Sequence, residues 1–139
     1  MTEELLRESL RQGAPLAREE FVRQHQDAVY TWFRSVPMGE EAATAAAISF
    51  FQKLLSARPP TEPLSFWLYR SLLHFPARAD AGGGASVLDR LRHLRPELRT
   101  VLFLRDIAQV DGPLTAQILE ISEATVRSRL QRARDEWAA

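Results

Sequence analysis

Three consecutive glycines at positions 82–84 divide this chain of 139 residues into two parts. Glycine loses more backbone freedom on folding than any other residue, so a run of three ends any helix. We therefore predict an N-terminal unit of residues 1–79, a linker of residues 80–86 and a C-terminal unit of residues 87–139. The linker spans at most about 20 Å when fully extended, so the two units are expected to lie close together.

Both units have the apolar spacing of helices, and neither shows the alternation of a β-strand. The predicted fold class is therefore all-α, with two small helical domains joined by a short glycine-rich linker. Thr2, Asp111 and Ser122 are predicted N-caps. The expected helices cover residues 3–12, 16–36, 40–56, 65–75, 86–94, 96–108, 112–119 and 122–137. In the helix at 96–108, one buried stripe is expected, made of Leu98, Val101, Leu102, Leu104 and Ile107.

Charge is balanced over the chain, with 18 basic and 18 acidic residues. Any nucleic-acid binding would therefore need a local basic face, because bulk positive charge is absent. The chain has no cysteine, which excludes disulfides and thiolate metal sites. No apolar run approaches the roughly 18 residues of a membrane span, and the charged N-terminal sequence is unlike a signal peptide. We expect a cytoplasmic protein with no membrane association.

Histidines and carboxylates show no arrangement typical of catalysis. His25, His74 and His93 lack the spacing of metal ligands, and no carboxylate pair recurs on one helix face. The glycine run lacks the Lys-Ser/Thr pair of a phosphate-binding loop. We therefore expect a protein that is not an enzyme and has no cofactor or metal site. The tryptophans fall on apolar stripes and are expected to pack in the core: Trp32, Trp67 and Trp137.

Residues 111–137 have the layout of a helix-turn-helix. A short helix leads into a turn at Glu120-Ile121, and a longer helix begins at Ser122. Apolar residues of the longer helix are spaced so that they share one face, which must pack against the preceding helices. These residues are Val126, Leu130, Ala133 and Trp137.

The rest of this last helix carries small, polar and basic side chains. Four arginines lie between residues 127 and 134, with no acid among them. Small and polar groups at the N-terminal end suit contacts with base edges, and arginines suit phosphates or guanine. The pattern favours a DNA recognition helix, and an amphipathic helix with a solvated basic face is the alternative. The face opposite the apolar one consists of Ala124, Ser128, Gln131 and Arg132, flanked by Arg127, Arg129 and Arg134.

The segment LRHLRPELRTVLFLRDIAQVDGPLTAQILEISEATVRSRLQRAR, residues 91–134, resembles region four of the extracytoplasmic-function sigma factors. The family pattern Leu-x-x-Leu-x-Pro-x-x-Arg followed by Val-Leu-x-Leu-Arg is matched at Leu91, Leu94, Pro96, Arg99, Val101, Leu102, Leu104 and Arg105. The resemblance implies contact with promoter DNA. The candidate DNA-binding residues are Thr125, Arg127, Ser128, Arg129, Gln131 and Arg132.

This segment departs from the family pattern in two places. Glu120 stands in the turn where the family usually has glycine. A left-handed backbone at that position would cost glutamate about 1 kcal/mol or more. The first helix of the motif begins at Asp111-Gly112-Pro113-Leu114 instead of Ser-Tyr or Ser-His. It is still expected to form, because proline is tolerated in a first turn.

Residues 1–79 resemble region two of the same family. The segment 67–70, Trp-Leu-Tyr-Arg, is similar to the start of the family's promoter-melting helix, and residues 21–34 are similar to its first helix. The acidic and amide residues of the family's polymerase-binding helix are replaced by AATAAAIS at 42–49. After Arg70 the family's DNA-facing polar residues are also missing, since this chain has Leu73, His74, Pro76 and Arg78 there.

Three hypotheses remain open for the whole chain. In the first, the chain is a divergent sigma factor that binds core RNA polymerase and promoter DNA, which the region-four pattern supports. In the second, it is a sigma-like regulator that has lost polymerase binding, which the alanine run supports. In the third, it is a mimic that binds an anti-sigma factor, and the arginine-rich last helix counts against this one. The candidate residues for polymerase or partner binding are Ala45, Phe51 and Lys53, unless the alanine run is an internal packing contact.

Overall fold

The computed structural model describes residues 2–36, 38–76 and 89–138, with the backbone alone for residues 89 and 90. The predicted linker at 80–86 lies outside the described residues, as do Arg78 and Pro37. The described residues contain helices and no strand, which confirms the all-α fold class. The helices are α1 (Glu3–Arg11), α2 (Pro15–Ser35), α3 (Glu40–Leu55), α4 (Leu64–His74), α5 (Asp89–His93), α6 (Pro96–Leu102), the π-helical turn η1 (Phe103–Ile107), α7 (Gly112–Leu119) and α8 (Glu123–Ala138).

The three predicted N-caps are confirmed. The backbone N–H of Leu5 donates to the Thr2 hydroxyl at 3.2 Å. In the same way, Leu114 donates to the Asp111 carboxylate at 2.8 Å. The backbone N–H of Thr125 donates to the Ser122 hydroxyl at 3.1 Å. Each bond satisfies a backbone donor that the first turn of a helix leaves unpaired, so these three helix starts follow from local sequence.

The start of α4 is stabilised from a distant part of the chain. Its N-cap residue, Pro63, makes no side-chain capping bond. Instead the backbone N–H of Leu64 donates at 3.0 Å to the Glu3 carboxylate, which α1 brings into place. The acid also favours the positive end of the helix dipole. The short N-terminal helix therefore fixes the position of α4.

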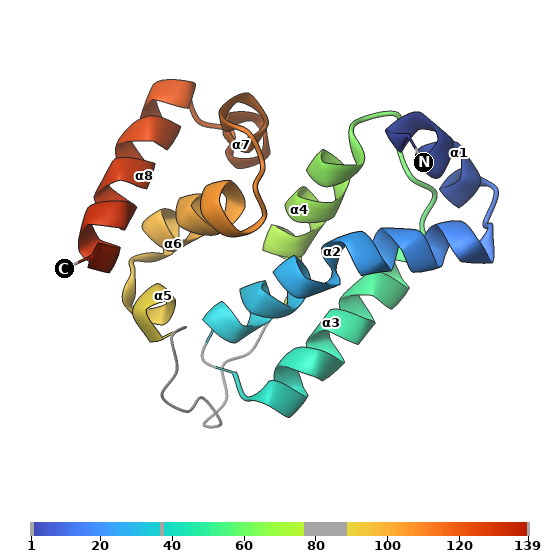
Figure 1. Cartoon of the computed structure of the whole chain (residues 1–139), viewed down its shortest axis with the longest axis horizontal. Coiled ribbons are helices and arrows are strands. Elements are labelled where there is room, and N and C mark those ends of the chain that lie inside the picture. Colours follow the sequence, from blue (N-terminus) through green and yellow to red (C-terminus); the bar gives the residue numbers. More distant parts are fainter. Residues whose placement is uncertain (1, 37, 77–88, 139) are drawn as a thin grey trace.

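The N-terminal half has an aromatic core. In Figure 1, α2 and α3 lie side by side, with α4 packed against them. Aromatic rings pack mainly edge to face, as in the pair Phe50 and Phe75, whose centroids are 5.5 Å apart. The tryptophans lie where packing was expected, with Trp32 buried and Trp67 and Trp137 half-buried. The largest fully buried side chains of this half are Phe21, Phe33, Phe50, Leu68, Leu72 and Val29.

A second core holds the C-terminal helices together. It forms where α6 packs against α8, with α7 beside α8. The predicted apolar face of the last helix is confirmed, because Val126, Leu130 and Ala133 are buried and Trp137 packs against this cluster. The other buried members of the second core are Leu91, Leu94, Leu98, Val101, Leu102 and Ala116.

The predicted stripe of residues 96–108 is divided between two cores. Leu98, Val101 and Leu102 belong to the second core, whereas Phe103 and Leu104 belong to the core of the N-terminal half. The prediction of one uninterrupted helix was wrong here, because α6 gives way to the π-helical turn η1. The widened turn changes the direction in which successive side chains point, so one segment packs into both cores.

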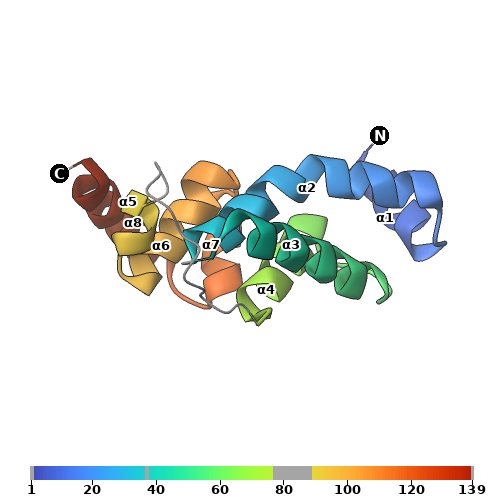
Figure 2. The same ribbon diagram turned by 90° about the horizontal axis from the view of Figure 1, so that it is seen from below.

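The two halves are in direct contact, as the short linker led us to expect. Figures 1 and 2 show them next to each other along the long axis, with α7 packed against α4 and α5 against α2. The guanidinium Nε of Arg92 in α5 donates to the backbone carbonyl of Arg34 in α2 at 2.9 Å. The apolar core of the N-terminal half continues across this contact into η1 and α7.

The turn after α7 contains a strained residue, Glu120. Its φ of 56° and ψ of 45° lie in the left-handed region, which is the conformation that the family's usual glycine at this position had suggested. A side chain in this conformation is strained, and glycine is not. We expect Glu120→Gly to raise the free energy of unfolding by about 1 kcal/mol in urea titrations followed by circular dichroism.

Two other glycine substitutions provide controls for this prediction. Gln109 also has a φ of 56°, so Gln109→Gly is expected to stabilise the chain similarly. Gln117 is exposed within α7, and glycine there should destabilise by about 1 kcal/mol. A loss of stability in Glu120→Gly would show that the glutamate side chain contributes more than its backbone costs.

Candidate nucleic-acid interface

The helix-turn-helix is built from α7, the turn at Glu120-Ile121 and α8. The left-handed Glu120 ends α7, and its backbone N–H is within bonding range of the carbonyls of Ala116 and Gln117. The backbone N–H of Ile121 donates to the carbonyl of Ala116 at 3.1 Å. This pair of bonds closes the last turn of α7, so the chain reverses within a few residues and α8 begins at once.

The predicted DNA-binding residues occupy the outward side of α8. Arg127, Ser128, Gln131 and Arg132 are exposed, while Thr125 and Arg129 are half-buried. The apolar face of the same helix points into the second core, so the outward direction of the polar face is set by packing. The structure therefore brings all six predicted residues together on one helix.

Some of these residues have partners that limit their freedom. The Thr125 and Ser122 hydroxyls lie 2.9 Å apart and form a hydrogen bond. The Gln131 amide donates to Asp135 at 2.9 Å, and Arg132 lies 4.0 Å from Glu136. Exposed contacts of this kind contribute little stability, so they can be exchanged for contacts with a ligand.

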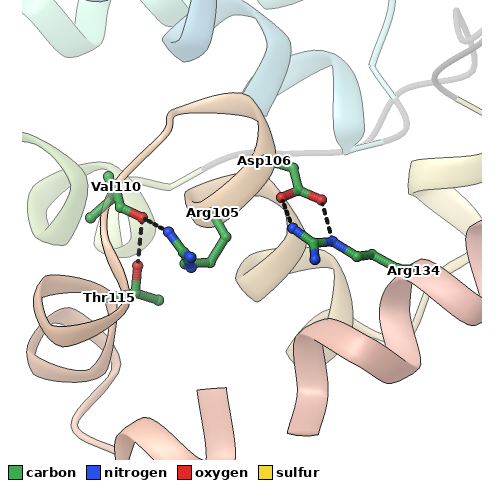
Figure 3. Close-up of polar contacts among 5 residues, drawn as sticks. All are labelled: Arg105, Asp106, Val110, Thr115 and Arg134. Atoms are coloured by element: carbon green, nitrogen blue, oxygen red, sulfur yellow. Dashed lines mark hydrogen bonds and ion pairs between the residues drawn. The ribbon is translucent and has the colours of Figure 1, made fainter. Parts of the chain in front are cut away.

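The four arginines of α8 fall into different classes. Among the described residues, Arg127 and Arg129 form no ion pair. The guanidinium of Arg134 donates two hydrogen bonds to the carboxylate of Asp106 in η1, of 3.0 Å from Nε and 2.6 Å from Nη2 (Figure 3). These hydrogen bonds and the charge of Asp106 raise the pKa of Arg134. The cationic groups left for a ligand are therefore concentrated toward the N-terminal half of α8.

The start of α7 is stabilised by one backbone carbonyl, that of Val110, which accepts two side-chain hydrogen bonds. The backbone oxygen of Val110 accepts a hydrogen bond from Arg105 Nη1 at 2.8 Å and another from the Thr115 hydroxyl at 3.4 Å (Figure 3). Thr115 is fully buried. The family pattern included Arg105 but gave it no role. In the structure, its side chain connects η1 to the start of the helix-turn-helix through this hydrogen bond. Asp106 was missed entirely, because its partner is 28 residues away and nothing local marks it.

The residues proposed for polymerase or partner binding lie in separate hollows around α3. Phe51 lines a groove of about 690 Å³ between α2 and α3, although only 7% of its surface is exposed. Ala45 is exposed in a neighbouring shallow hollow. Lys53 faces a third hollow, against the Phe75 ring. The first and second hollows share Ile48, which is 54% exposed.

The α2/α3 groove is mostly apolar. Its polar residues include Gln26 and two charged residues, the positive Arg18 and the negative Asp27, so the lining has no net charge. The side chains that line the apolar part of the groove are Val22, Tyr30, Ala47, Ile48, Phe51 and Leu55. A groove of this size and composition suits an apolar helical segment of another protein better than a charged ligand.

Residues 2–36, 38–76 and 89–138 hold no group of three or more His, Cys, Asp or Glu placed to bind a metal ion. Within the same ranges, no helix has both the length and the apolar character to span a membrane.

Comparisons with known proteins agree with this geometry. The family model of sigma-70 region 4 matches residues 85–136, which contain α5 to α8. No curated protein sequence matches the chain. Among solved structures, the chain is similar to CnrH, an extracytoplasmic-function sigma factor solved in complex with the cytosolic domain of CnrY. The two chains are 25% identical with a TM-score of 0.82, over 98% of this chain and 94% of CnrH. Residues 85–136 therefore match sigma-70 region 4, and the chain as a whole shares the fold of CnrH.

Proposed function

We propose that this chain controls transcription initiation by binding promoter DNA through α8. The observation that carries the proposal is a pair of arginines, Arg127 and Arg129, that form no ion pair with any residue the structure describes and lie on the outward side of a helix-turn-helix that matches region four. Sigma factors are transcription regulators and not enzymes. We propose accordingly that the chain acts by binding alone, without catalysis or a cofactor, and that it works in the cytoplasm where the DNA is.

Some of the six α8 residues would contact the phosphate backbone of DNA, and the others would contact the edges of its bases. Arg127, Arg129 and Arg132 have the charge to neutralise phosphates. Ser128 and Gln131 have side chains of the size and polarity that read base edges in the major groove. Thr125 would sit at the N-terminal end of the helix, where recognition helices approach the bases. A bound duplex would compete with the weak contacts that Gln131 and Arg132 make with Asp135 and Glu136.

The double variant Arg127→Ala/Arg129→Ala tests this proposal. Each arginine that neutralises a phosphate adds about 0.9 to the slope of log affinity against log salt. We expect the variant to bind labelled mixed-sequence duplex DNA about tenfold or more weakly, with a salt slope smaller by about 2. Fluorescence anisotropy titrations at several salt concentrations measure both quantities.

A matched control removes the same charge from the other half. Arg23 and Arg58 are exposed in the N-terminal half, and Arg23→Ala/Arg58→Ala should keep the affinity and the slope of the natural chain. Equal effects of the two double variants would mean that only net charge matters. An Arg127→Ala/Arg129→Ala variant with unchanged affinity and slope would remove α8 as the DNA-binding element.

A second candidate function is binding of a protein partner at the α2/α3 groove. It is supported by the apolar lining of the groove and by the exposed Ile48. CnrH was solved with the cytosolic domain of CnrY, so we propose that this chain likewise takes a protein partner, either core RNA polymerase or an anti-sigma factor. Size-exclusion chromatography with core RNA polymerase distinguishes these, because a polymerase-binding chain co-elutes with the enzyme. A chain that elutes alone would leave the anti-sigma factor as the partner.

We further propose that the functional units follow the predicted boundaries. Residues 1–79 would form the region-two-like unit, residues 87–139 the DNA-binding unit, and residues 80–86 the connection between them. The matched span of the family model, which begins at residue 85, supports the second boundary to within a few residues.

A further inference from the structure

One long, uncharged polar side chain, that of Gln131, stands on the outward side of α8. The two turns before it on the same stripe of the helix carry only the small side chains of Ala124 and Ser128, and all three residues are exposed. Side chains of a helix lean toward its N-terminus, so Gln131 extends over Ser128 toward the end of α8 that would enter the major groove. Gln131 therefore has the reach to contact a base edge with its amide.

The Gln131 amide has a partner one turn further along α8. Its Nε2 donates a hydrogen bond to Oδ1 of Asp135 at 2.9 Å, and both residues are exposed. A glutamine and an aspartate four residues apart form this bond even in isolated helices, because the two positions are neighbours on the helix surface. The pair therefore does not depend on how α8 packs against the rest of the chain.

Asp135 decides which way round this amide stands. An ionised carboxylate only accepts hydrogen bonds, whereas an amide has two N–H donors on its nitrogen and an acceptor oxygen. Only the nitrogen of Gln131 can therefore face Asp135, and the amide oxygen faces away from it. The order of the pair matters, since in α2 Gln24 donates to Glu20, four residues before it, at 3.0 Å, and the nitrogen of that amide is directed toward the N-terminus instead.

The orientation of the Gln131 amide suits adenine better than the other bases. Adenine presents an amino donor and the acceptor N7 in the major groove, and a glutamine amide pairs with both at once. With one N–H on Asp135, Gln131 keeps its oxygen and a second N–H, which are the two groups that adenine needs. Guanine presents two acceptors, so Gln131 would need both of its N–H groups there and would have to release Asp135. The competition between DNA and Asp135 for Gln131 therefore depends on the base.

We propose that Asp135 is a positioning residue that gives α8 a base preference: by holding the Gln131 amide in this orientation, it favours adenine over guanine at the base pair that Gln131 reaches. Asp135 has this effect without touching the DNA itself. The inference rests on the proposed function, because it requires α8 in the major groove. A carboxylate also repels phosphates, so replacing Asp135 should raise the affinity for every duplex while it lowers the selectivity.

The base pair that Gln131 reads is found first. The full-length natural chain selects duplexes from a library of random sequence, and each base pair of the preferred duplex is then changed in turn. Fluorescence anisotropy compares the natural chain with Gln131→Ala, which should no longer distinguish the four bases at one base pair. There the natural chain is expected to bind adenine about tenfold or more tightly than guanine. A different preferred base, or no base pair that depends on Gln131, would overturn the inference.

Asp135→Asn tests the positioning role at this base pair. Asparagine has nearly the same shape, but its amide both donates and accepts, so it does not fix the orientation of Gln131. We expect the preference for adenine over guanine to fall to about threefold or less. Asp135→Glu keeps an acceptor-only carboxylate four residues from Gln131 and should keep the preference. Position 135 is exposed, so both variants should stay folded, as circular dichroism checks. A full preference in Asp135→Asn would contradict the role of Asp135.

Glu136→Gln is the matched control for charge. Glu136 is the next residue and is exposed, but it lies near Arg132 and Arg95, at 4.0 and 3.7 Å. Its replacement should raise the affinity for every duplex and leave the adenine preference unchanged. If it lowered the preference as much as Asp135→Asn does, the effect would be one of charge and the positioning role would be refuted.

Failure of this inference is distinguishable from failure of the proposed function. A natural chain that binds no duplex DNA would refute the proposed function and the role of Asp135 together. A chain whose binding is weakened by Arg127→Ala/Arg129→Ala, but whose adenine preference survives Asp135→Asn, would refute the role of Asp135 alone.

Discussion

Ala43→Glu is expected to unfold the N-terminal half of this protein. Ala43 lies on the inner side of α3 with none of its surface exposed, in the same core as Phe50 and Leu54. A glutamate there would need room that the packed core lacks and would bury a carboxylate with no partner. We expect the free energy of unfolding to fall by about 3–5 kcal/mol, measured by urea titration with circular dichroism.

Ala45→Glu is the matched control, two positions along the same helix. Ala45 is exposed, so its replacement by glutamate should change the free energy of unfolding by no more than about 0.5 kcal/mol. Equal losses in the two variants would show that the face assigned to Ala45 is wrong. Ala45→Glu also restores one acid to the alanine run, in a variant that should stay folded. Stronger polymerase binding by this variant than by the natural chain would show that the alanine run limits polymerase binding.

Phe21→Ala is expected to produce the largest loss of stability among single truncations of an aromatic ring in α2. Its side chain is fully buried and lies among three other rings. The ring centroids of His25, Trp67 and Phe51 are 5.0, 5.8 and 6.4 Å away. Removing the ring leaves a cavity between α2, α3 and α4, so the free energy of unfolding should fall by about 3–5 kcal/mol.

Phe66→Ala provides the comparison for this truncation. Phe66 lies in α4 but is only half-buried, and its ring carries the Arg70 guanidinium at 5.5 Å from the centroid. The expected loss is about 1 kcal/mol, because less apolar surface leaves the core and the cation–π contact is exposed. Similar losses in the two variants would indicate that α4 does not pack as described. Differential scanning calorimetry of both variants under the same conditions measures the difference.

Features that depend on neighbouring residues were predictable from the sequence. The N-caps at Thr2, Asp111 and Ser122 each require one side chain and a backbone N–H three residues later, so local sequence is enough. The buried face of α8 follows from helical spacing, as Val126 and Leu130 confirm. The outward side of the same helix, with the candidate DNA-binding residues, follows from the same spacing. Helix positions and one face of the site were therefore predictable.

Features that depend on tertiary contacts were not predictable. The carboxylate of Glu3 caps a helix that begins 61 residues later, and the guanidinium of Arg134 binds Asp106 in another helix. Neither pairing leaves a local signal in the chain. The division of one apolar stripe between two cores at Phe103 was missed for a related reason. Hydrophobic spacing shows which residues are buried but not which partner buries them.

The π-helical turn η1 makes the length of this segment unusually important. A regular α-helix advances by about 100° per residue, so deleting one residue between Phe103 and Ile107 would let the segment become α-helical but would rotate everything after it. α7 and α8 would then face a different direction relative to α2 and α4. Substitutions on the surface of η1 should be tolerated far better than an insertion or deletion of a single residue. The register of this turn, more than its composition, would then determine where the recognition helix points.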